Sequence, residues 1–282
     1  MKQKVYNLII LDESGSMEMI AKQAVSGLNE TLQSIVSAQK EHEDQEHYVS
    51  FVTFNSSRIN TVMNRQKVEL EKNLKWNDFS PNNCTPLFDA MGQSICELRN
   101  NIEKDDVVLV TIITDGMENA SREYDGKAIK KLVSDLKERG WLFVYIGTNQ
   151  DVDAVADSMG IRSRMCYDYS PAGAECMFEV ERSSKRAFFD RLSRKGRSIL
   201  LDEEYDYFSA NDQEDNKDEK EPDIIWDMKE EESSSSYDKD PHDKNEKESA
   251  EAEQEQVNSD TVDIEGSKKH MGLWDKVKNF IK

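Results

Sequence analysis

The stretch VYNLIILDESGSM, residues 5–17, decides the fold expected for this chain. Its first seven residues form a continuous apolar run that is too short for a helix and is typical of a strand covered on both faces. Asp12, Ser14 and Ser16 follow at every second position, where the strand is expected to end. Apolar residues then recur at helical spacing over residues 20–36, which predicts a long amphipathic helix directly after the polar loop.

Apolar runs and helical patterns alternate along the next 150 or so residues. The segments expected to be strands are residues 47–55, 58–70, 106–114, 141–147 and 164–169, with 58–70 and 164–169 at the sheet edges. The segments expected to be helices begin near Leu87, Lys127, Asp151 and Pro171. This alternation predicts a doubly wound α/β fold, with a mostly parallel central sheet and helices on both faces.

Negative charge is concentrated near the end of the chain. Residues 202–265 contain 26 Asp and Glu against six Lys, and their net charge of −20 equals the formal charge of the whole chain. A segment with so few apolar residues cannot bury enough surface to offset the entropy of ordering. We therefore expect a folded domain at 1–201, a disordered acidic tail at 202–267 and a short amphipathic helix at 268–282.

The charge balance of residues 1–201 excludes several classes of partner. Without a basic stripe, direct binding to nucleic acid or to an anionic membrane surface is not expected. No run of 18 apolar residues and no signal-peptide pattern occurs, so we expect a cytoplasmic protein without stable membrane insertion. The cysteines show no C-x-x-C spacing and are expected to be reduced and mostly buried; they are Cys84, Cys96, Cys166 and Cys176.

Polar residues collect at the predicted carboxyl ends of the central strands. Asp12 and Asp115 each end an apolar run, and ligands of open α/β sheets bind at this edge, so we expect the two side chains to be neighbours. Thr85 lies just before a predicted helix and completes the set. Oxygen donors without sulfur or imidazole select Mg²⁺, Ca²⁺ or Mn²⁺ over zinc or copper. The candidate metal ligands are Asp12, Ser14, Ser16, Thr85 and Asp115.

Three motifs in this order resemble a known binding site. DESGS (12–16), TPLFDA (85–90) and the strand ending in TDG (114–116) resemble the metal-ion-dependent adhesion site (MIDAS) of von Willebrand factor A (VWA) domains. The resemblance covers roughly residues 1–200. Within that family, VTIITDGMENASREY and YIGTNQDV are most similar to cytoplasmic bacterial and phage proteins of the TerY group, associated with tellurite-resistance operons.

The resemblance implies a binding function and a Rossmann-like VWA fold. In the family the two serines, and in the ligand-bound form the threonine, contact the metal directly, while the aspartates act largely through water. The implied cofactor is Mg²⁺, with Mn²⁺ and Ca²⁺ as alternatives, and the open metal position recruits an Asp or Glu of a partner protein. The implied role is that of a cytosolic scaffold in a bacterial or phage stress-response system.

An enzyme is the alternative interpretation. A Mg²⁺-dependent phosphohydrolase would use Asp12 to form an aspartyl-phosphate, but such enzymes resemble D-x-D at the first strand. Here Ser14 stands where the second acid would act as general acid or base, and a serine cannot do so near neutral pH. No His accompanies a Ser or Cys as nucleophile and base. We therefore expect no enzymatic activity.

Other polar residues near the predicted site have less specific interpretations. We expect Glu13 and Glu118 to be exposed, solvated acids. Thr148, Asn149 and Asp151 lie near the site and could contact a ligand, but capping of the helix that starts at Asp151 is the favoured role for this segment. The residues expected at the surface are His42 and His47, and those expected in the core or at its edge are Trp76 and Trp141.

The predicted tail has features of its own. DIIWDM (223–228) is either an accidental hydrophobic island or a short binding motif. MGLWDKVKNFIK at the end predicts a basic amphipathic helix, for which a partner groove or an intramolecular contact is favoured over a membrane. A tail carboxylate could also occupy the open metal position, because a flexible tether gives an effective concentration on the order of millimolar.

Overall fold

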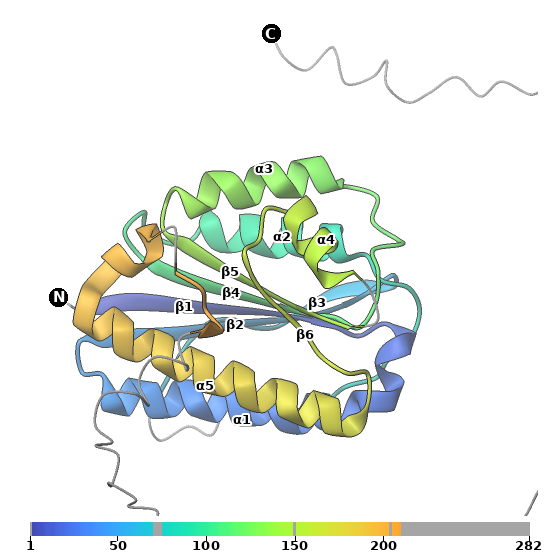
Figure 1. Cartoon of the computed structure of the whole chain (residues 1–282), viewed down its shortest axis with the longest axis horizontal. Helices are drawn as coiled ribbons and strands as arrows, with labels where there is room; N and C mark the ends of the chain where they lie inside the picture. Colours follow the sequence, from blue (N-terminus) through green and yellow to red (C-terminus); the bar gives the residue numbers. More distant parts are fainter. Residues whose placement is uncertain (1, 70–74, 149–150, 203–204, 210–282) are drawn as a thin grey trace, which may run out of the picture. The chain divides into compact units, whose positions relative to one another are not determined.

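The computed structural model describes residues 2–69, 75–148, 151–202 and 205–209 (Figure 1). These residues belong to one compact unit that spans Met1–Pro222. The remainder of the predicted tail, the DIIWDM segment and the predicted C-terminal helix lie outside the described residues.

Six strands form one sheet in the order β3-β2-β1-β4-β5-β6. All neighbouring pairs are parallel except β2 and β3, which are antiparallel. The predicted mostly parallel sheet is confirmed, and the two segments expected at its edges are its edge strands. The strand bounds are β1 Gln3–Asp12, β2 Gln45–Asn55, β3 Arg58–Lys67, β4 Val107–Ile113, β5 Trp141–Gly147 and β6 Ser163–Cys166.

Helices cover both faces of the sheet, as predicted. In Figure 1, α1 and α5 lie together on one face and α2, α3 and α4 on the other. Each face buries its own apolar layer, because the strands are apolar on both sides. The helix bounds are α1 Ala21–Glu41, α2 Leu87–Arg99, α3 Gly126–Lys137, α4 Val152–Ser158 and α5 Pro171–Lys195, with 3₁₀ helices η1 Gly15–Ile20 and η2 Gly196–Leu201.

The start signals of two helices are confirmed by their contacts. The Ser170 side chain accepts a hydrogen bond from the backbone N–H of Gly173 at 3.0 Å, and Pro171 is the first residue of α5. Asp151 caps α4 in the same way, as predicted. The long helix predicted after the Asp/Ser loop is confirmed as α1, but it does not follow the loop directly. The backbone N–H of Met17 bonds the carbonyl of Ser14, a 3₁₀ pattern, so η1 comes before α1.

The two histidines depart from the prediction. His47 has no exposed surface and packs edge-on against Phe189, with ring centroids 4.6 Å apart. Burial, with the charge of the nearby His42 as the second cause, lowers the pKa of His47 to about 3. His42 is half-buried, with its Nε2 3.0 Å from Asp190. The charged neighbours of His47 hid the strand alternation that directs its side chain inward.

Two further predictions concern the burial of the cysteines and of the tryptophans. Cys84, Cys166 and Cys176 are exposed free thiols and Cys96 is a half-buried one, so the expectation that they are mostly buried is wrong. The two tryptophans are buried, as predicted; they are Trp76 and Trp141.

The folded unit continues past residue 201. Tyr207 is fully buried, and its hydroxyl donates to Oε1 of Glu181 at 3.4 Å. Glu181 also pairs with Lys185 at 2.8 Å, and both side chains are buried. Residues 205–209, which were expected to belong to the acidic tail, therefore include a buried anchor on α5. Among the described residues, no helix is long and apolar enough to cross a membrane.

Candidate functional site

Asp12 ends β1 and has no exposed surface. Its Oδ1 accepts a hydrogen bond from the backbone N–H of Ser14 at 2.7 Å, and its Oδ2 accepts one from the Thr114 hydroxyl at 2.6 Å. The first of these bonds turns the chain within two residues, a role to which Asp is well suited. As a result the hydroxyl oxygens of Ser14 and Ser16 lie 3.2 Å apart.

Asp115 follows β4, the strand beside β1, and it reaches the same loop. Its Oδ1 accepts a hydrogen bond from the Ser16 hydroxyl at 2.7 Å. Its neighbour Thr114 is the residue that donates to Asp12. The expectation that the two aspartates lie near each other at the carboxyl edge of the sheet agrees with these contacts.

Thr85 comes from the loop before α2. Its backbone N–H donates to Oδ1 of Asn119 at 2.9 Å, and the N–H of Asn119 donates to the Thr85 carbonyl at 3.1 Å. A methyl group on the Cα of Gly116 would lie 3.2 Å from Thr85 Oγ1, 3.6 Å from Ser16 Oγ and 3.9 Å from Asp12 Oδ2. The three oxygens thus surround one small space, and the structure brings all five predicted ligand residues together.

The two carboxylates of the site are buried, and no positive side chain among the described residues forms an ion pair with them. Burial, with the charge of Asp115 as a smaller cause, raises the pKa of Asp12 to about 6, although the hydrogen bonds from Thr114 and Ser14 act to lower it. Burial likewise raises the pKa of Asp115. Neither residue takes part in an ion pair with another described residue. A bound cation would provide the missing compensation, since buried charges are normally paired or coordinated.

The donor set fits a hard dication. Hydroxyl and carboxylate oxygens suit Mg²⁺, Ca²⁺ and Mn²⁺. Among the described residues, no group of three or more His, Cys, Asp or Glu is arranged to hold a metal. The site is therefore distinguished by its three hydroxyls, with Ser14 and Thr85 buried and Ser16 open to solvent.

Glu13 does not lie in solvent, contrary to the prediction. It has no exposed surface, and its Oε1 accepts a hydrogen bond from the backbone N–H of Ser80 at 2.9 Å. The guanidinium of Arg58 lies 3.4 Å from it. The backbone N–H of Glu13 donates a hydrogen bond to the carbonyl of Phe54, so the β1–β2 pairing continues through this residue. The Glu13 side chain is directed into the protein. It anchors the loop that carries Thr85.

Glu118 is also not a free acid. It is half-buried, and its Oε2 accepts a hydrogen bond from the backbone N–H of Phe88 in the first turn of α2, at 2.9 Å. Its Oε1 accepts from the backbone of Ala120 and Ser121. Glu118 thus fixes the loop after Asp115 to the helix that follows Thr85.

Sequence reasoning missed three residues that shape the site. Thr114 holds Asp12, Gly116 leaves room among the oxygens, and the Tyr169 hydroxyl donates to the backbone carbonyl of Ser16. The TDG motif contained the first two without assigning them roles. Nothing local in the sequence connects Tyr169 to Ser16, because they are 153 positions apart.

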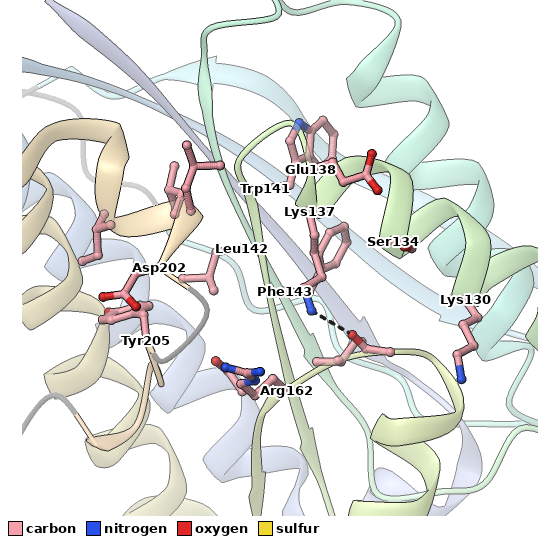
Figure 2. Close-up of a pocket in the computed structure, with 16 residues that line it drawn as sticks. Lys130, Ser134, Lys137, Glu138, Trp141, Leu142, Phe143, Arg162, Asp202 and Tyr205 are labelled. Carbon is pink, nitrogen blue, oxygen red and sulfur yellow. Dashed lines mark hydrogen bonds between the residues drawn. The ribbon is translucent and has the colours of Figure 1, made fainter.

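A separate cavity of about 540 Å³ lies at the other end of the sheet (Figure 2). It lies beside Trp141, the first residue of β5, whereas the candidate site lies at the carboxyl ends of the strands. Figure 2 shows Lys130, Arg162 and Tyr205 among its lining residues. None of the five candidate ligands lines this cavity.

Comparison with known proteins gives matches in solved structures alone. No family model matches the sequence, and no curated protein matches it. The similar structures include proximal thread matrix protein 1 from the mussel byssus, at 14% identity and a TM-score of 0.44. That match covers 71% of this chain and 46% of the mussel chain, so less than half of the latter is represented. Another structure of the mussel protein is described as having a zinc-occupied MIDAS motif.

Two further structures come from bacterial pili. The PilB minor pilin of Streptococcus sanguinis matches at 10% identity and a TM-score of 0.46, covering 66% of this chain and 62% of that one. The vWF domain of the pilus tip protein Mfa5 of Porphyromonas gingivalis matches at 9% identity and a TM-score of 0.48, covering 67% and 97%. None of these structures shares more than 15% identity with this chain.

Proposed function

We propose that this chain is a VWA-type protein-binding module that depends on a divalent metal. The candidate ligands are Asp12, Ser14, Ser16, Thr85 and Asp115, and Mg²⁺ is the proposed ion, with Mn²⁺ and Ca²⁺ as alternatives. The observation that carries the proposal is the convergence of hydroxyl and carboxylate oxygens from three loops around the position that a Cβ on Gly116 would occupy.

The residues of the site have different roles in this proposal. Asp115 accepts a hydrogen bond from the Ser16 hydroxyl, which leaves the lone pairs of that oxygen available to a cation. Asp12 accepts hydrogen bonds from Ser14 and Thr114 and so fixes the loop. When bound, the ion would supply a positive centre that attracts an Asp or Glu carboxylate of a partner protein. The exposed Ser16 is on the side from which a partner can approach.

The arrangement of Asp12 favours binding over catalysis. A nucleophilic aspartate needs an accessible oxygen, but Asp12 is fully buried and each of its oxygens accepts a short hydrogen bond. Ser14 cannot replace the missing acid as a proton donor near neutral pH. We therefore propose a non-enzymatic module.

The finer assignment rests on the sequence motifs. VTIITDGMENASREY and YIGTNQDV support a cytoplasmic scaffold resembling the TerY group, in a bacterial or phage stress-response system. A carboxylate from the part of the predicted acidic tail after the buried Tyr207, residues 210–267, is a candidate internal ligand of the metal. Deleting residues 210–282 would then tighten partner binding, and unchanged affinity would contradict the idea.

Metal binding is tested by titrating the full chain with Mg²⁺ or Mn²⁺ in a calorimeter. We expect saturable binding that is lost in Ser14→Ala/Ser16→Ala and retained in Ser26→Ala, which removes an exposed hydroxyl from α1. Equal binding by both variants would contradict the assignment of the site.

Partner binding is tested in a second step. Proteins captured from a host lysate in Mg²⁺ but not in EDTA are identified and then titrated individually against the full chain. We expect one Asp or Glu of the partner to be essential, so that its amide variant no longer binds. Affinity that is indifferent to EDTA, or to every acidic substitution in the partner, would contradict the proposed function.

A further inference from the structure

Three buried polar atoms beside the candidate metal site have no hydrogen-bond partner within 3.5 Å among the described residues, although the Tyr169 hydroxyl lies near Asp115 and acts to lower its pKa. They are Asp115 Oδ2, Thr148 Oγ1 and Tyr167 Oη. Thr148 has no exposed surface, and the other two residues are less than 8% exposed. Buried polar groups are nearly always hydrogen-bonded, so three such atoms in one region require an explanation.

The three residues lie in one row across the sheet. Continuing the β4–β5 register by two residues places Asp115 opposite Thr148, and continuing the β5–β6 register by one residue places Thr148 opposite Tyr167. The backbone N–H of Tyr167 donates to the carbonyl of Gly147 at 3.0 Å, so the alignment persists beyond β6. Neighbouring strands are about 4.8 Å apart, which gives a row about 10 Å long.

The side chains of the row are directed to one face. In a strand, side chains two positions apart point to the same face, so the Asp115 side chain points the same way as Ile113, and Thr148 the same way as Ile146. Both isoleucines belong to the apolar layer under α1 and α5. Tyr167 belongs to the same layer. Its pKa is raised first by burial and next by the negative charge of Asp115, so the hydroxyl lies within electrostatic reach of the site.

We propose that Tyr167 and Thr148 are positioning residues that hold Asp115 through buried water. A buried water needs two to four polar partners, and this row offers two hydroxyl donors and one carboxylate oxygen. Oδ2 of Asp115 would then be fixed, which keeps Oδ1 on the Ser16 hydroxyl. The part of this inference that concerns the metal rests on the proposed function.

The row predicts how two hydroxyls affect metal affinity. Tyr167→Phe and Thr148→Val each remove a hydroxyl and nearly preserve the shape of the side chain. Without its outer partners the Asp115 carboxylate can rotate away from Ser16. Groups that orient a metal ligand typically contribute about 10–100-fold to metal affinity. We expect the lower end, about tenfold for each variant, because the hydrogen bond to Ser16 remains.

The test compares the Mn²⁺ affinities of full-length variants. Tyr205→Phe is the matched control, because the Tyr205 hydroxyl is also buried without a partner among the described residues but lines the distant cavity (Figure 2). We expect the Mn²⁺ affinity of Tyr205→Phe to lie within about twofold of wild type. We expect the double variant Tyr167→Phe/Thr148→Val to lose less Mn²⁺ affinity than the product of the two single-variant losses. Wild-type affinity in Tyr167→Phe, or an equal loss in Tyr205→Phe, would overturn the proposal.

A second readout does not need the metal. In EDTA, a water-bonded Tyr167 hydroxyl proton exchanges slowly with solvent and gives a proton NMR signal that Tyr167→Phe removes and Tyr205→Phe retains. Absence of that signal in wild type would overturn the row itself. If wild type shows the signal but binds no Mn²⁺, the water-mediated contacts of Tyr167, Thr148 and Asp115 are supported. The proposed function and the role of these residues at a metal site are then both contradicted.

Discussion

Gly116→Ala is the substitution that separates metal binding from folding most clearly. The added Cβ would lie 3.2 Å from Thr85 Oγ1, 3.6 Å from Ser16 Oγ and 3.9 Å from Asp12 Oδ2. Mg²⁺ requires oxygen ligands at about 2.0–2.1 Å in a nearly ideal octahedron. A methyl group among these oxygens would displace a metal ligand or the ion, and we expect affinity to fall by about tenfold or more, equivalent to about 1.4 kcal/mol.

The same change should scarcely affect the metal-free protein. Gly116 is not among the glycines with positive φ, so alanine can adopt its backbone conformation. Replacing such a glycine typically stabilises a protein by about 0.4–1 kcal/mol through the unfolded state. The 3.2 Å contact offsets part of this gain. We therefore expect a change of less than about 1 kcal/mol in EDTA.

Thermal unfolding in EDTA and in Mg²⁺ measures both effects. At a Mg²⁺ concentration 100 times the dissociation constant, wild type gains about 2.7 kcal/mol, whereas a variant that binds tenfold more weakly gains about 1.4 kcal/mol. For a domain of this size the difference is about 3–5 °C in the metal-dependent rise of Tm. Gly15→Ala is the control, because its Cβ would contact the Asn83 backbone at 3.6 Å, an ordinary distance. A full metal-dependent rise in Gly116→Ala would refute the reasoning.

Further predictions concern the buried charges, each measured by urea denaturation. Burial raises the pKa of Asp12 from 3.8 to about 6, so the metal-free protein should lose stability as pH rises between these values. At pH 7 in EDTA, Asp12→Asn should therefore be more stable than wild type by roughly 2–3 kcal/mol, and near pH 4 the two should be about equally stable. The prediction is contradicted if wild type is more stable than Asp12→Asn at pH 7. Glu13→Ala should cost about 1.5–3 kcal/mol because the backbone N–H of Ser80 loses a charged acceptor, and Glu13→Gln should cost less because an acceptor remains; equal costs would argue against that cause. Lys185→Met should cost about 3–5 kcal/mol by leaving Glu181 unpaired, and adding Glu181→Leu should recover most of it; no recovery would contradict an electrostatic origin.

The fold could be predicted because its signals are local. Continuous apolar runs marked the central strands, and residues such as Ser170 and Pro171 marked a helix start. The proximity of the candidate ligand residues could be predicted for a related reason, since strands that end at one edge bring their next residues together. The contacts of Asp12, Ser16 and Asp115 agree with that argument.

The supporting residues could not be predicted from local patterns. Glu13 is buried because a loop 67 positions away supplies Ser80, and Tyr169 reaches Ser16 across 153 positions. Charged neighbours made His47 look exposed although strand alternation buries it. These residues are placed by long-range packing, which composition and periodicity do not record.

The most direct test of the central claim is a crystal structure of the full chain grown with Mn²⁺, with the metal located by anomalous scattering. The proposed site predicts one strong peak at about 2–2.6 Å from the hydroxyl oxygens of Ser14 and Ser16, on the side of Thr85 and Asp115. A map with no peak there at saturating Mn²⁺, or with a peak only elsewhere on the protein, would contradict it.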